Sequence, residues 1–273
     1  MTSTAYNAYL RTETLHSLQV PVTRDEGERS FLVVCQVQEL YFALISHDIG
    51  AASQHLREDA LAEATASVQR AGSHFAGLNA SWRSLDWMLP ADFAAIKHGM
   101  TAVHGKSTSL QSWTYREMLF RLGLKDASLV EELANMPEQH AQLREALQAL
   151  SVYEEALALA RRQGHELPTA EASDTDTDTD TDGEHHLDPA VVSFWTSVLL
   201  SPEPHLSDFR AFARALIGVA EGLAEYRFLH YLATSRTLGA RPAHFGVSGV
   251  AWLTPTLTVM PFPELWATRT GGE

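Results

Sequence analysis

Cysteine is almost absent from this sequence: Cys35 is the single one among 273 residues. One cysteine excludes an internal disulfide and any paired-cysteine metal or redox motif, which is typical of proteins from a reducing cytoplasm. The sequence also lacks a secretory leader and a run of about 18 apolar residues, so we expect neither secretion nor a membrane span. These absences favour a cytoplasmic protein.

Basic residues are also few. Lys and Arg number 20 against 34 Asp and Glu, giving a formal net charge of −14 at pH 7. A surface of this sign repels phosphates, so nucleic acid and anionic membrane are poor candidates for partners. Part of the charge lies in one Asp-Thr repeat, and the rest of the chain is less acidic than the total indicates.

Strand signals, alternating apolar and polar residues between turn dipeptides, are nearly missing. Apolar residues at helical intervals, among many Ala, Leu, Glu and Arg, predict helices along most of the chain. Pro90 and Pro137 stand where first helical turns are expected, and Gly123 and Gly164 where helices end. We therefore predict an all-α fold in one domain of residues 1–273. The predicted helices cover residues 31–49, 56–82, 89–100, 109–126, 136–164, 189–200 and 208–239.

The stretch "EASDTDTDTDTDGEHHLDP" interrupts the helical pattern. A strict Asp-Thr alternation is weakly hydrophobic and self-repelling, so residues from about 168 to 188 are predicted to form a disordered insertion. Counted from Asp174, Thr179 stands where an EF-hand loop needs Gly and His185 where it needs the bidentate Glu. The stretch is therefore not a calcium loop of that kind.

Three features are hard to explain as ordinary core. Arg116 lies among large apolar residues in "QSWTYREMLF", where it either extends to water or binds an anion. His230 falls on a helical apolar stripe in "AEYRFLHYLATSRTLG", as a core histidine or as a single axial haem ligand. Near the N-terminus, Tyr6, Tyr9 and Leu10 form an apolar cluster that suggests docking onto another surface.

Four blocks of sequence follow one another in a distinctive order: "YNAYLRTETLHSLQ", "FLVVCQVQELYFALISHDI", "LDWMLPADFAAIKHGM" with "SLQSWTYREMLFRLGLKD", and "EYRFLHYLATSRTLGARPAHFGVSG" with "FPELWATRT". Together they resemble the tryptophan 2,3-dioxygenase family of haem enzymes. The matching family motifs are Tyr-x-x-Tyr-Leu, Phe-x-x-x-His-Gln-x-x-Glu-Leu-Trp, Gln-Ser-x-Gln-(Tyr/Phe)-Arg and the haem-ligand helix. The resemblance covers most of the chain.

This resemblance implies an all-helical homotetramer with one haem b per subunit, in which each N-terminal segment reaches into a neighbour's active site. His230 matches the proximal iron ligand, Arg116 the clamp for the substrate carboxylate, and Phe31 a residue that packs on the indole ring. The further implied contacts are those of haem with Trp82 and Ser109 and those of a neighbour's substrate with Tyr6, Tyr9 and Leu10.

The sequence departs from the family pattern in two places. Cys35 stands where the family has a distal histidine that accepts a hydrogen bond from the indole N–H, and a thiol is a smaller and weaker acceptor. In "AHFGVSG", Val247 replaces a hydroxyl that contacts the substrate ammonium, and His244 adds an ionisable group. We expect Cys35 and Val247 to contact substrate, with Cys35 and His244 the candidate catalytic residues.

The resemblance implies oxygenation of tryptophan or a substituted tryptophan by dioxygen at indole C2–C3. The departures leave open whether two oxygen atoms are inserted or one; a single insertion gives a 2-oxindole and needs an external reductant. They also suggest a role in secondary metabolism. Two other readings remain at this stage: a haem-dependent tyrosine hydroxylase, and a non-enzymatic haem or ligand sensor on the same scaffold.

Overall fold

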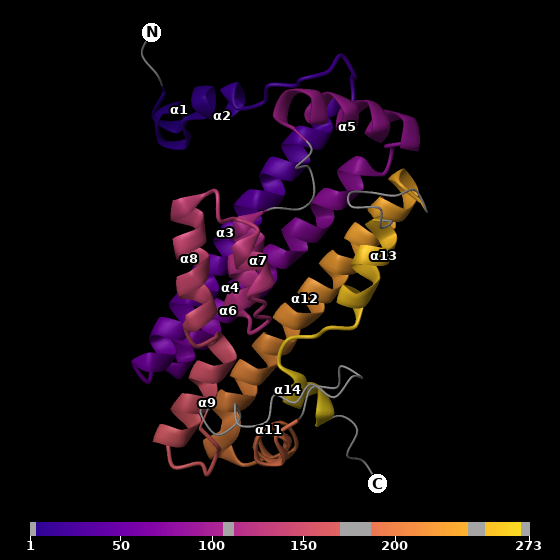
Figure 1. The fold of residues 1–273 in the computed structure, drawn as a ribbon. Helices are drawn as coiled ribbons and strands as arrows, with labels where there is room; N and C mark the ends of the chain where they lie inside the picture. The colour runs from indigo at the N-terminus through magenta and orange to yellow at the C-terminus, as the bar shows by residue number, and fades with distance from the viewer. Residues whose placement is uncertain (1–3, 106–111, 170–186, 240–248, 269–273) are drawn as a thin grey trace.

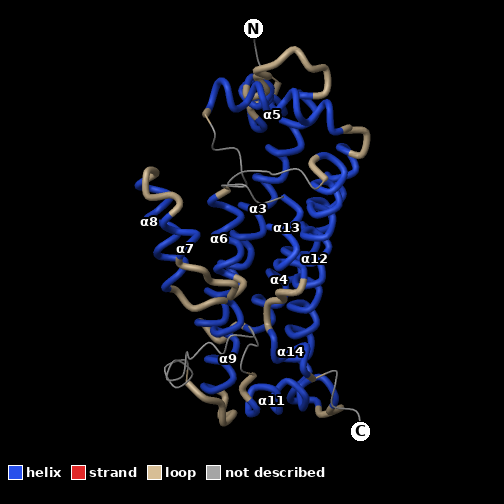
Figure 2. The backbone as a smooth tube through the Cα atoms, turned by 45° about the vertical axis from the view of Figure 1, so that its right-hand side comes forward, coloured by secondary structure: helices blue, strands red, loops and turns tan. Residues whose placement is uncertain are grey.

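The structure, a computed structural model, describes residues 4–105, 112–169, 187–239 and 249–268. Within these ranges every regular element is a helix, so the all-α prediction is confirmed. The helices form an elongated bundle (Figures 1 and 2), with α1 and α2 at the end that carries the N-terminus. The Asp-Thr repeat lies outside the described residues, and the prediction of disorder there stays untested.

The first half of the chain contains α1 (Ala5–Leu10), α2 (Thr12–Ser17), α3 (Glu28–Arg57), α4 (Leu61–Ser81), the 3₁₀ turn η1 (Trp82–Leu85), α5 (Pro90–His104), α6 (Trp113–Arg121) and α7 (Ser128–Glu131). The second half contains α8 (Pro137–Gln148), α9 (Val152–Arg162), α11 (Pro189–Leu200), η3 (Pro204–Leu206), α12 (Ser207–Thr237), α13 (Gly249–Leu253), η4 (Thr254–Leu257) and α14 (Pro263–Ala267).

Three long helices form the centre of the bundle. α4 packs against both α3 and α12, and these are the most extensive contacts between elements (Figure 1). A glycine allows close approach of α12 and α4: a Cβ on Gly222 of α12 would lie 2.6 Å from the Phe75 Cβ of α4. Helices α6 and α9 cover α3, while α11 and α13 lie against α12. A single apolar cluster runs through these helices, and a smaller one lies under α5.

Two predicted helices are each divided in the structure. The segment 56–82 contains the end of α3 and all of α4, separated at Asp59, whose φ of 58° breaks the helix. The segment 136–164 divides into α8 and α9 at Ser151, whose side chain accepts a hydrogen bond from the Glu154 N–H. Reciprocally, the Glu154 carboxylate accepts from the Ser151 N–H, forming a capping box that begins a new helix.

The inner face of α3 differs from the expected apolar stripe. Leu40 and Leu44, two of the apolar residues at helical intervals that predict the helix over residues 31–49, are 63% and 41% exposed. The buried side instead includes Gln38 and Asp48, and the Asp48 carboxylate pairs with Arg70 at 3.0 Å. A long core helix can hold such groups because their hydrogen bonds are satisfied within the bundle.

By length and composition, α3 alone among the described helices could cross a membrane. In the structure it packs on α4, α6 and α9, and 28% of its most apolar window is buried. Packing within the chain therefore covers only part of the apolar surface of this helix.

Candidate active site

Two aromatic rings meet where α12 passes η1. The imidazole of His230 stacks on the indole of Trp82, with ring centroids 5.2 Å apart and 18° between the planes. Tyr226 lies one turn earlier on the same face of α12, 6.1 Å from the His230 ring and 5.8 Å from Trp82. This cluster gathers the predicted iron ligand and one predicted haem contact, both of them implied by the family resemblance.

Burial controls the protonation of His230. It lowers the pKa of the imidazole to about 4, so the ring is neutral at pH 7, which is the form that binds metals. Nearby polar atoms are left without partners: Trp82 Nε1 and Ser235 Oγ are both buried and make no hydrogen bond with the described residues. Unpaired buried donors are costly, so they are commonly explained by a ligand or by water.

Cys35 faces the same region from α3. Burial, and secondarily the Glu39 carboxylate, raise the pKa of the thiol to about 12. The thiol is therefore neutral at pH 7, which argues against a nucleophile. Burial also raises the pKa of Tyr226, and Tyr115, Cys35 and Glu39 add to the effect. Their mutual influence places these four side chains at one wall of the cluster.

Arg116 is deeply buried in α6, with 4% of its surface exposed. The side chain therefore does not extend to water, one of the two readings left open by the sequence. Its Nη1 donates to the Leu129 carbonyl at 2.6 Å, and its Nη2 donates to the Glu132 carboxylate at 2.5 Å. The guanidinium is thus turned toward α7 and already has two acceptors.

The neighbouring Tyr115 connects α6 to the aromatic cluster. Its ring lies 5.1 Å from Phe42 of α3 and 5.7 Å from Tyr226 of α12. Phe31, one turn before Cys35 on α3, packs edge-on against Phe93 of α5 at 5.9 Å. The predicted ring contact and the predicted distal residue therefore share one face of α3.

The N-terminal residues lie apart from this cluster. Tyr6 and Tyr9 on α1 are 68% and 87% exposed, and Leu10 is 44% exposed. Figure 1 shows α1 and α2 beside the end of the bundle rather than within it. Of the other expected site residues, Ser109, His244 and Val247 lie outside the described residues.

Sequence reasoning did not select Glu39 or Tyr226 as site residues. Glu39 follows Cys35 by four residues, so a helical projection places both on one face of α3. Tyr226 precedes His230 by four residues in the same way. Helical spacing from the selected residues was therefore the available signal for both.

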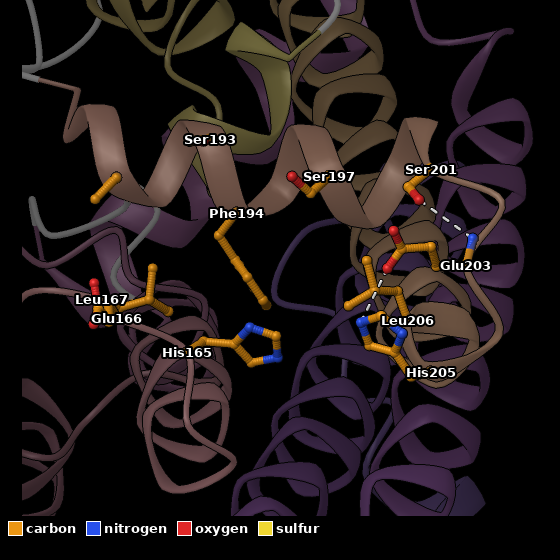
Figure 3. Close-up of a pocket in the computed structure, with 11 residues that line it drawn as sticks. His165, Glu166, Leu167, Ser193, Phe194, Ser197, Ser201, Glu203, His205 and Leu206 are labelled. Atoms are coloured by element: carbon orange, nitrogen blue, oxygen red, sulfur yellow. Dashed lines mark hydrogen bonds and ion pairs between the residues drawn. The ribbon is translucent and has the colours of Figure 1, made fainter.

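A cleft of about 420 Å³ lies at the other end of the bundle from His230, between α11 and η3 (Figure 3). Phe194 and His165 pack in its floor with ring centroids 4.9 Å apart, and His205 pairs with Glu203 at 3.2 Å. It lies near the start of α12, whereas His230 lies near that helix's end, roughly 35 Å further along the axis. The two regions are therefore separate.

The sequence profile of the tryptophan 2,3-dioxygenase family matches residues 1–176. Three relatives carry the name tryptophan 2,3-dioxygenase. The protein of Pseudomonas fluorescens Pf-5 is 31% identical over 268 residues, 98% of this chain and 91% of the relative. That of Pseudomonas aeruginosa PAO1 is 32% identical over 97% of this chain and 88% of its own. That of Burkholderia pseudomallei K96243 is 31% identical over 98% and 84%.

The sequence matches define a family of haem-dependent oxygenases, and the all-helical fold is consistent with it. The chain belongs to the tryptophan 2,3-dioxygenase family. The resemblance described from the four sequence blocks is confirmed.

Proposed function

We propose that this protein uses haem b and dioxygen to oxygenate the indole ring of tryptophan, or of a substituted tryptophan, at C2–C3. The observation that carries the proposal is the neutral imidazole of His230 stacked on Trp82, since a single histidine is enough to hold a haem iron. The names of the relatives support the substrate class and the chemistry.

The residues present fit a haem. His230 supplies a neutral imidazole nitrogen that can bind iron, and Trp82 Nε1 is a buried N–H without a hydrogen-bond partner among the described residues. We assign iron ligation to His230, and haem contacts to Trp82 and Ser109. Bound haem would supply the iron at which dioxygen is activated. Stacking on Trp82 restrains the imidazole in one orientation, as outer partners of metal ligands commonly do.

For the substrate, we assign carboxylate binding to Arg116 and contact with the indole ring to Phe31 and Cys35. A guanidinium buried this deeply is suited to a carboxylate, because charge-assisted hydrogen bonds strengthen where water is excluded. Substrate must then share Arg116 with Glu132 or displace it. The neutral Cys35 thiol accepts the indole N–H only weakly. Val247 provides no hydroxyl for the ammonium group, and His244 is the proposed proton donor or acceptor.

Assembly completes the proposed site. We propose a homotetramer in which Tyr6, Tyr9 and Leu10 of one subunit line the substrate pocket of another. The exposure of all three side chains on a short separate helix supports this exchange. Exposed apolar side chains on the long helices, Leu40 and Leu44 on α3 among them, offer further contact area between copies.

Cys35 favours a second outcome of the same reaction. A thiol accepts the indole N–H only weakly, so the ring could move after the first oxygen atom is inserted. The product would then gain one oxygen atom, and an external reductant would supply the electrons that reduce the second oxygen atom to water. That outcome gives a 2-oxindole and fits a role in secondary metabolism. The relatives' name favours insertion of both atoms, and a measurement of product mass decides.

Purified protein loaded with haem tests the proposal. We expect a Soret band that is lost in His230→Ala while the far-UV circular dichroism of the apoprotein is unchanged. Incubation with isotopic dioxygen and tryptophan, or its methylated forms, should give products heavier by two oxygen atoms or by one. If every indole amino acid returns unchanged with dioxygen and a reductant, the proposal fails.

The variant Cys35→His tests whether residue 35 decides between insertion of one oxygen atom and insertion of two. Cys35→Ala is the control for a change in side-chain size. An imidazole at this position restores a strong acceptor for the indole N–H. If wild-type product carries one added oxygen, we expect Cys35→His to shift it toward two and Cys35→Ala to leave it unshifted. An unaltered product in Cys35→His would limit residue 35 to packing.

A further inference from the structure

The carboxylate of Glu39 joins α3 to the first turn of α6. Its Oε2 accepts hydrogen bonds from Ser112 Oγ at 2.9 Å and from Thr114 Oγ1 at 2.5 Å. The three side chains are only partly exposed or buried, so water competes poorly for these bonds. Hydrogen bonds to an ionised acceptor are about twice as strong as neutral ones.

Ser112 connects the Glu39 carboxylate to the backbone of α6. It is the N-cap residue: its Oγ accepts from the Tyr115 N–H at 3.0 Å, and its carbonyl accepts from the Arg116 N–H at 3.3 Å. Because the Ser112 hydroxyl donates to Glu39, its lone pairs remain free to accept from Tyr115. A continuous chain of hydrogen bonds therefore runs from α3 to the backbone of the residues that form the proposed substrate site.

The far end of Arg116 is fixed independently. The guanidinium is bound by Leu129 and Glu132 on the α7 side, while Glu39 acts on the first turn of α6. Loss of the Glu39 contact would let that turn shift relative to α3, and a displacement of about 1 Å at a positioned group can cost two orders of magnitude in rate.

We propose that Glu39 is a positioning residue, which sets Arg116 for the substrate's carboxylate through Ser112 and Thr114. This inference rests on the proposed function, because it takes Arg116 as the carboxylate clamp. It adds a specificity-determining residue outside the group that contacts substrate. The alternative is that Glu39 binds the substrate's ammonium directly, since it lies at the same wall as Cys35 and Tyr226.

Three ligands distinguish these roles in haem-loaded protein. L-tryptophan has both charged groups, tryptamine lacks the carboxylate, and indole-3-propionate lacks the ammonium. Affinities are read from the change each ligand makes in the haem spectrum. We expect Glu39→Ala to lower the affinity for L-tryptophan and indole-3-propionate about tenfold, and to leave the affinity for tryptamine within about twofold of wild type.

Two further variants control for folding and for chemistry. Glu39→Gln keeps one oxygen acceptor, so we expect its affinities within about threefold of wild type. The double variant Ser112→Ala/Thr114→Val should reproduce Glu39→Ala, and combining all three changes should cause no additional loss, because all act through one chain of contacts. The ligand-free Soret band should stay unchanged in every variant.

The outcomes are distinct. If Glu39→Ala lowers the affinity for L-tryptophan and tryptamine only, Glu39 binds the ammonium and the positioning role is overturned. An equal loss of affinity for all three ligands, or no loss, would also overturn the positioning role. Wild-type protein that binds none of the three ligands would overturn the proposed function itself, and this inference with it.

Discussion

The indole of Trp82 lies 5.2 Å from the imidazole of His230 and nearly parallel to it, at an interplanar angle of 18°. Trp82 belongs to η1 and His230 to α12, so the contact fixes the orientation of the histidine from outside its own helix. A freely rotating imidazole would lose conformational entropy on binding metal, and the stacked ring has already lost part of it. If His230 binds haem iron as proposed, the stacking orients the imidazole before haem binds.

Replacing Trp82 tests this preparation. Trp82→Phe keeps an aromatic face, so we expect its dissociation constant for haem to stay within about threefold of wild type, whereas Trp82→Leu should raise it about tenfold. Haem titration of the apoprotein, followed at the Soret band, measures both. Equal values for the two variants would show that the ring face does not orient His230.

Glu132 competes with substrate for Arg116 in the proposed site. Its side chain is 56% exposed whereas that of Arg116 is 5% exposed, so solvent screens only the Glu132 end of the ion pair. Glu132→Gln removes the competing charge and leaves the buried guanidinium with the Leu129 carbonyl and a neutral amide. We expect L-tryptophan to bind about two- to fivefold more tightly and the melting temperature of the ligand-free protein to fall. Glu131→Gln, which alters the adjacent exposed carboxylate, is the matched control. Weaker binding in Glu132→Gln would instead mean that Glu132 holds Arg116 in its working orientation.

Glu28 links stability to pH at the start of α3. Burial alone would raise the pKa of its carboxyl group, but hydrogen bonds from the Thr23 hydroxyl and from the Val22 and Thr23 N–H groups outweigh it, and the net pKa is lowered. The stabilisation is thus present above the unfolded-state pKa and is lost as pH falls through the folded-state value.

We therefore expect Glu28→Gln to lower the free energy of unfolding by about 1–3 kcal/mol at pH 7. The difference from wild type should shrink as pH falls through the lowered folded-state pKa, below which the wild-type carboxyl is protonated in both states. Urea unfolding at pH 7 and at a series of acidic pH values measures this. A difference that persists at low pH would assign the effect to packing rather than to charge.

Two glycines in α12 should respond to alanine in opposite ways. A Cβ at Gly222 would lie 2.6 Å from the Phe75 Cβ, whereas a Cβ at Gly218 meets nothing within 4 Å. Gly222→Ala should lower the free energy of unfolding by about 1–3 kcal/mol through overpacking against α4. Gly218→Ala should raise it by roughly 0.5–1 kcal/mol, because alanine loses less backbone entropy in a helix. Denaturant unfolding of the pair tests how closely α12 and α4 are packed.

Local signals in the sequence predict much of the fold. The helix predicted over residues 189–200 is α11 with the same bounds, because Pro189 suits a first turn and the Asp188 carboxylate caps it. The break at Ser151 also has a local signal, Ser-x-x-Glu, which was overlooked within a long helical pattern. The break at Asp59 has none: a non-glycine residue with positive φ is selected by the packing of α3 against α4.

The site is less accessible to local reasoning. For His230, the residue pattern alone left two readings, and the family resemblance supplied the expectation of a haem ligand. The partners of Arg116 lie 13 and 16 residues away in sequence, and those of Glu39 lie more than 70 residues away. Such pairings depend on how the helices pack, which no helical period encodes.

The exposed α1 helix makes the proposed active site a property of the assembly rather than of one chain. If Tyr6 and Tyr9 complete a neighbour's pocket, the fraction of complete sites follows mass action, and turnover per subunit falls on dilution. A subunit whose α1 segment (called the arm) is altered would lower the activity of its neighbour's site, while its own site would stay intact. Mixed assemblies of arm-deficient and Arg116-deficient subunits would therefore recover activity that neither parent has.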